Sequence, residues 1–85
     1  MPDYSQQQDL IISVTDLIAK TLGVPVDQIT EGLSYGDLPE WDSLGHMNIM
    51  MALEEKYGIQ ITTDVITSLI NLKSITAYLL DHNNA

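Results

Sequence analysis

The stretch DSLGHMNIMMALEEKYG, residues 42–58, decides the fold, because it predicts a complete helix with a signal at each end. Asp42 is a favoured N-cap residue, and Gly58 is a favoured C-terminal stop for a helix over residues 43–57. The apolar residues between these two signals recur at helical spacing. The rest of the chain is therefore interpreted around this helix.

The residues before this helix are predicted to form a loop. Pro39 disfavours a helical conformation in the residue before it, and it has no N–H of its own to donate. Ser43 consequently stands where loop meets helix, and its hydroxyl is expected to be exposed. A serine in a first helical turn is common, so the position gains meaning only from its surroundings.

The apolar residues of the 43–57 helix fall into two rows. The row expected to face the core comprises Ile49, Leu53 and Tyr57, with Met50 at its edge. The second row comprises Leu44, Met47 and Met51, flanked by Asn48, Glu54 and Glu55. We interpret the second row as a docking stripe for partner proteins, since methionine side chains adapt to several surfaces. Ordinary core packing is the alternative, and it is nearly as well supported for Met51.

The remaining sequence predicts three further helices. Apolar spacing and Gly23 indicate a helix over about 4–22, and Thr62 to Asp64 offer caps for a short helix over 64–70. Ser74 is expected to cap a last helix over 74–82. The expected fold is all-α: a single domain over 1–85, built as a four-helix bundle with a short third helix and a long loop between helices one and two.

Composition limits the classes of function. The 85 residues include no cysteine, so neither disulfides nor thiolate metal sites are available. Twelve acidic residues against three basic ones give a formal charge of −9, which repels nucleic acid and anionic lipid and favours partners with basic surfaces. The start of the chain lacks the pattern of a signal peptide, and no apolar run has transmembrane length. These features predict a cytoplasmic location, and we expect a monomer.

Asp42-Ser43-Leu44, together with the Leu-Glu-Glu-Lys-Tyr-Gly stretch at 53–58, resembles the acyl carrier protein family. The resemblance implies that Ser43, with Asp42 and Leu44 beside it, carries 4′-phosphopantetheine transferred from coenzyme A by a phosphopantetheinyl transferase. Acyl or aminoacyl groups would then be attached as thioesters to the thiol at the end of this phosphopantetheine arm. Enzymes that load and process these groups would dock on Leu44, Met47, Met51, Glu54, Glu55 and Trp41. The protein itself would not be an enzyme.

Several positions depart from the commonest fatty-acid carriers. Gly45 and Asn48 stand where acidic residues are frequent, and Gly45 costs about 1 kcal/mol of helix propensity relative to alanine. The Pro39-Glu40-Trp41 lead-in differs from the small residues found there in fatty-acid carriers, and the size of Trp41 suits either docking or the core. These departures favour a specialised pathway, such as secondary-metabolite, polyketide, lipid or glycan biosynthesis. The identity of the carried group stays open.

Two alternatives remain in view. One is a catalytic triad of Asp42, Ser43 and His46, which are close in sequence. No walled pocket or oxyanion hole is indicated, so His46 is instead expected to face solvent or to contact the phosphate of the phosphopantetheine arm. The other alternative is a small acidic adaptor or inhibitor that acts through the 43–57 helix without modification. A metal site is disfavoured, because Asp37, Glu40 and Asp42 lack the spacing of a calcium loop.

Overall fold

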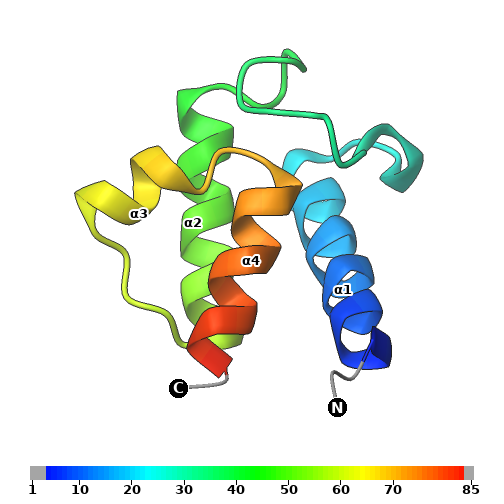
Figure 1. The fold of residues 1–85 in the computed structure, drawn as a ribbon. Helices are drawn as coiled ribbons and strands as arrows, with labels where there is room; N and C mark the ends of the chain where they lie inside the picture. The colour runs from blue at the N-terminus through cyan, green and yellow to red at the C-terminus, as the bar shows by residue number, and fades with distance from the viewer. Residues whose placement is uncertain (1–3, 84–85) are drawn as a thin grey trace.

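The computed structural model describes residues 4–83, and over these residues the chain is helical (Figure 1). The elements in chain order are α1 (Tyr4–Leu22), the short 3₁₀ helix η1 (Val26–Gln28), α2 (Ser43–Tyr57), α3 (Thr63–Ser68) and α4 (Leu72–Asn83). The predicted all-α architecture with a short third helix is confirmed. The single-domain prediction over 1–85 extends to residues 1–3 and 84–85, which lie outside the described part.

The bundle is built on α1, which packs against both α2 and α4, while α3 packs against α2. The long loop between α1 and α2 crosses the end of the bundle at which α2 begins (Figure 1). This loop is fastened to the rest of the fold by an isolated antiparallel bridge between Ser34 and Asn71. The loop is therefore held beside the start of α2.

The core is aliphatic apart from one tryptophan. Side chains without measurable exposure include Val14, Ile18, Trp41, Ile49, Met50, Leu53, Ile75 and Leu79. The core-facing row predicted for α2 is buried at Ile49, Met50 and Leu53, and half-buried at Tyr57. The 3.6-residue period thus assigns the inner face of α2 correctly.

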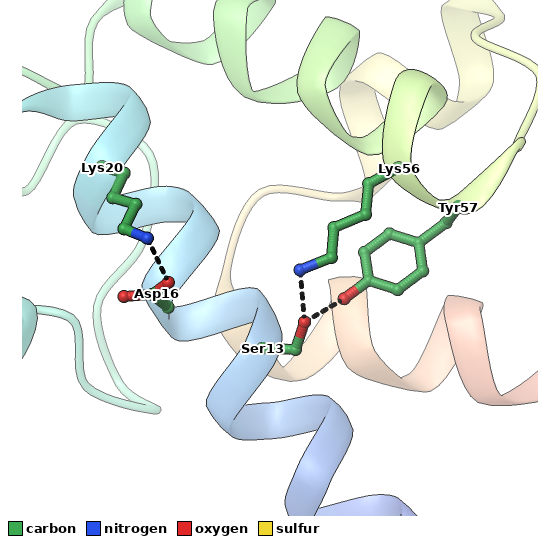
Figure 2. A network of polar contacts seen from close by, with 5 residues as sticks. All are labelled: Ser13, Asp16, Lys20, Lys56 and Tyr57. Carbon is green, nitrogen blue, oxygen red and sulfur yellow. Dashed lines mark hydrogen bonds and ion pairs between the residues drawn. The ribbon is translucent and has the colours of Figure 1, made fainter.

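A polar network joins α1 to the last turn of α2 (Figure 2). The hydroxyl groups of Ser13 and Tyr57 lie 2.7 Å apart, and the Lys56 ammonium donates to the same Ser13 oxygen at 2.7 Å. One turn along α1, Lys20 pairs with Asp16 at 3.1 Å. The Lys20–Asp16 pair is exposed and lies within α1, so it contributes little stability, whereas the contacts of Ser13 with Lys56 and Tyr57 connect α1 to α2.

The start of α4 differs from the expected one. The helix begins at Leu72, and its cap is Asn71, whose side-chain oxygen accepts a hydrogen bond from the Ser74 N–H at 2.7 Å. The Ser74 hydroxyl contacts the Asn71 N–H in return, at 3.2 Å. Ser74 is thus the third residue of the helix, in a reciprocal arrangement like a capping box. In α3, Thr62 is the cap and accepts from the Val65 N–H.

Candidate functional site

Ser43 is the first residue of α2, and its side chain is exposed, as the sequence predicts. Asp42 has extended backbone angles, and its carboxylate accepts a hydrogen bond from the Gly45 N–H at 2.9 Å. The Asp42 carbonyl accepts the first bond of the helix, from the His46 N–H at 2.8 Å. The N-cap is therefore Asp42, and the Ser43 oxygen lies at the positive end of the helix dipole, which favours a bound phosphate group.

Tyr35 is the residue beside Ser43 that sequence reasoning missed. Its hydroxyl lies 2.9 Å from the Ser43 hydroxyl. The Tyr35 backbone N–H donates to the carbonyl of Ile70 at 2.7 Å, which fixes this part of the loop against the connection between α3 and α4. A polar aromatic residue in a loop carries no local signal of such a contact, because the loop path depends on residues about 35 positions further along the chain.

Trp41 and His46 form a buried pair behind the serine. The Trp41 side chain is fully buried, and its indole N–H donates to Nδ1 of His46 at 3.1 Å. His46 is 4% exposed, and its Nε2 lies 2.8 Å from the carbonyl oxygen of Ile66. Because an indole N–H only donates and a carbonyl only accepts, these partners require the neutral imidazole with its hydrogen on Nε2. The pair ties the loop and α2 to α3.

Two predictions are corrected by this pair. Trp41 was expected among the docking residues, with the core as the alternative, and the core alternative holds because a side chain with no exposed surface contacts no partner. His46 was expected to face solvent or the arm's phosphate, whereas it is buried and both of its ring nitrogens are engaged. With neither nitrogen directed at Ser43, His46 is also not the base of a serine triad.

The Tyr35 ring packs against His46, one member of this buried pair. Its centroid lies 5.1 Å from that of the His46 ring, in an edge-to-face arrangement at 81°. Edge-to-face packing at this distance is a favoured aromatic geometry. The Ser43 hydroxyl is thus contacted by a tyrosine whose backbone and ring are both held by the fold.

A cavity of about 380 Å³ opens beside Ser43, between α2, α3 and the loop. Its lining residues are Tyr35, Ser43, His46, Met47, Ile66, Thr67 and Ile70. The volume lies in the range of small-molecule pockets, and the walls are largely apolar. An exposed hydroxyl at a helix N-terminus beside such a cavity fits a group with a phosphate at one end and a flexible chain at the other.

The outer row of α2 is exposed, as the docking interpretation requires. Leu44, Met47 and Met51 are 72%, 39% and 57% exposed, and Ile70, which lines the cavity, is 38% exposed. Glu54 and Glu55 are exposed further along the helix. Core packing is excluded for Met51 as for Leu44. That partners bind this surface stays a prediction.

The structure explains why residue 45 is a glycine, which the sequence did not predict. A Cβ atom built on Gly45 would overlap the backbone carbonyl oxygen of Glu40 and would lie 2.9 Å from a methyl carbon of Leu22. The loop therefore passes so close to the first turn of α2 that only glycine fits. This close approach brings the loop that carries Tyr35 up to Ser43.

The acidic residues of the loop do not form a metal site. Asp37 accepts from the Ser34 N–H at 2.8 Å, as in a tight turn. Within residues 4–83, no group of three or more histidine or acidic side chains is placed to hold a metal ion. Among the helices of this same part of the chain, none has the length and apolar character needed to span a membrane.

Comparison with known proteins gives consistent matches. The family described as "Phosphopantetheine attachment site" matches residues 13–79. The acyl carrier protein of Zymomonas mobilis is 29% identical over 69 residues, covering 81% of this chain and 88% of the relative. The meromycolate extension acyl carrier protein of Mycolicibacterium aurum is 27% identical over 75 residues, covering 88% of this chain and 77% of the relative. The matched region includes Ser43, the cavity and the outer row of α2.

Proposed function

This chain belongs to the phosphopantetheine attachment family, and from that premise we propose that it is an acyl carrier protein with Ser43 as the attachment residue. The family's cofactor is 4′-phosphopantetheine, held covalently. Bound to this chain, the cofactor would supply a terminal thiol that holds acyl or aminoacyl groups as thioesters.

The observation that carries the proposal is the placement of Ser43. Its hydroxyl is exposed at the N-terminus of α2, where the helix dipole favours a phosphodiester, and it lines the cavity of about 380 Å³. Among the other serines whose burial the structure describes, Ser13, Ser34 and Ser74 are half-buried. Ser68 is exposed, but it ends α3 rather than beginning a helix.

The roles of the surrounding residues follow from their positions. Asp42 caps α2 and keeps Ser43 at the boundary of the helix. Leu44, Met47 and Met51 present an apolar surface next to Ser43, and Glu54 and Glu55 add negative charge near the far end of α2. The proposed partners are a phosphopantetheinyl transferase and acyl-loading and acyl-processing enzymes with apolar docking surfaces flanked by basic residues.

The proposal extends to how the protein works. It performs no chemistry of its own, and the tethered arm offers each docked enzyme a high effective concentration of substrate. Because Gly45 and Asn48 are uncharged, docking close to Ser43 relies more on apolar contact than on charge. This favours a dedicated carrier of a specialised biosynthetic pathway, acting as a cytoplasmic monomer.

Loading with coenzyme A tests the proposal. Incubation with a broad-specificity phosphopantetheinyl transferase is expected to add one phosphopantetheine mass to the wild-type protein and to the Ser68→Ala variant. Ser43→Ala is expected to gain no mass and to lose function in the host. If Ser43→Ala kept full cellular function, the protein would instead act as an adaptor that needs no modification.

A further inference from the structure

The loop places Tyr35 against Ser43, and other residues of the fold hold Tyr35 in that position. Tyr35 is 42% exposed, yet it is held at its backbone by Ile70 and at its ring by His46. His46 is in turn fixed by hydrogen bonds to Trp41 and Ile66. A side chain supported in this way loses little conformational entropy when it makes a further hydrogen bond.

The direction of the bond between the two hydroxyl groups depends on the state of Ser43. With a free serine, either oxygen can donate across the 2.9 Å separation. Once Ser43 carries a phosphodiester, its oxygen has no hydrogen left, so only Tyr35 can donate. Bonds from a neutral donor to a charged phosphate oxygen are stronger than bonds between two neutral groups.

Resting on the proposed function, we propose that Tyr35 is a positioning residue for arm attachment: its hydroxyl selects one rotamer of Ser43 in the apo protein and donates to the phosphodiester after loading. With Tyr35 as the donor, the serine keeps its own hydrogen for transfer and one lone pair for attack. The Tyr35 side chain also lines the cavity, so a phosphodiester held by its hydroxyl lies at the cavity mouth.

The attachment reaction shows where this positioning acts. The Ser43 oxygen forms a bond to the phosphorus next to the pantetheine half of coenzyme A, and the bond from that phosphorus to the bridging oxygen of the diphosphate breaks. The adenosine half leaves as the 3′,5′-bisphosphate, and the serine proton passes to a base of the transferase. A serine oxygen already held in one orientation loses less freedom on reaching this geometry.

The test compares Tyr35→Phe with wild type, with Tyr57→Phe as the matched control. Tyr57 also contacts a serine hydroxyl, that of Ser13, but at the opposite end of α2 (Figure 2). In the apo protein, three-bond Hα–Hβ couplings measured by NMR report the Ser43 rotamer. We expect one dominant rotamer in wild type and in Tyr57→Phe, and averaged couplings in Tyr35→Phe.

Transferase kinetics give the second readout. Tyr35→Phe is expected to lower kcat about three- to tenfold with KM nearly unchanged, since one exposed hydrogen bond is lost and the docking surface is intact. The ³¹P resonance of the loaded protein is expected to move in Tyr35→Phe and not in Tyr57→Phe. Unchanged Ser43 couplings together with equal or faster loading of Tyr35→Phe would overturn the inference. Failure of wild type to load would instead count against the proposed function.

Discussion

Replacing Gly45 by alanine is expected to destabilise the protein, although helix propensity alone predicts a gain in stability. In an ordinary helical position, alanine is favoured over glycine by about 1 kcal/mol. At Gly45 the added methyl group would overlap the Glu40 carbonyl oxygen, which belongs to the backbone and cannot rotate away. Leu22 is also in the way, but its methyl carbon is the end of a flexible side chain and can move.

The expected loss of stability is the cost of the steric overlap minus the gain in helix propensity. Forcing extra volume into a packed site costs about 1–3 kcal/mol, because the backbone must shift. The propensity gain is reduced in a first helical turn, so it offsets less than about 1 kcal/mol of that cost. We therefore expect Gly45→Ala to lower the free energy of unfolding by about 1–2 kcal/mol. Because the shift moves the loop away from α2, transferase loading should slow as well.

Urea unfolding measures this change directly, with a constant m-value as the check that both proteins unfold in one step. Gly32→Ala is the matched control, since a Cβ there meets nothing within 4 Å and the backbone angle is not in the left-handed region. The control is expected to be neutral or to gain up to about 1 kcal/mol through the unfolded state. If Gly45→Ala were as stable as wild type or more so, the close approach of loop and helix would be refuted.

Three further predictions concern the residues around Ser43. Trp41→Phe leaves Nδ1 of buried His46 without its donor and should lower the free energy of unfolding in urea by at least about 1–3 kcal/mol; no loss would mean that the hydrogen bond is absent. Asp42→Ala should cost about 1 kcal/mol in the same assay while Asp42→Asn costs much less, and equal losses would contradict the capping role. Leu44→Ser should change stability by less than about 0.5 kcal/mol yet raise the KM of the transferase, and an unchanged KM would argue against docking at this residue.

The parts of the structure that sequence predicts well are those decided by neighbouring residues. Asp42 caps α2 through a bond to a residue three positions away, and Gly58 ends it with a φ of 69° that glycine adopts easily. The inner and outer faces of α2 likewise follow from its helical period. The cap of α4 is also local, because Asn71 lies three residues before Ser74, the spacing of a reciprocal cap.

The parts that sequence did not predict depend on contacts between distant segments. The Nε2 atom of buried His46 meets the Ile66 carbonyl, 20 residues further along, and no local pattern predicts that contact. The same holds for Tyr35, which is placed by Ile70. Gly45 likewise carried no local signal, because helix propensity counts a glycine in a helix only as a cost, and the close approach of the Glu40 carbonyl depends on the path of the loop.

Locating the added mass on the chain tests the central claim most directly. Wild-type protein loaded from coenzyme A would be digested, and the modified peptide sequenced by tandem mass spectrometry. The result expected is one phosphopantetheine on Ser43 and none on Ser34 or Ser68. A phosphopantetheine on another residue, or none under conditions that load a control carrier, would contradict the assignment of Ser43 as the attachment site.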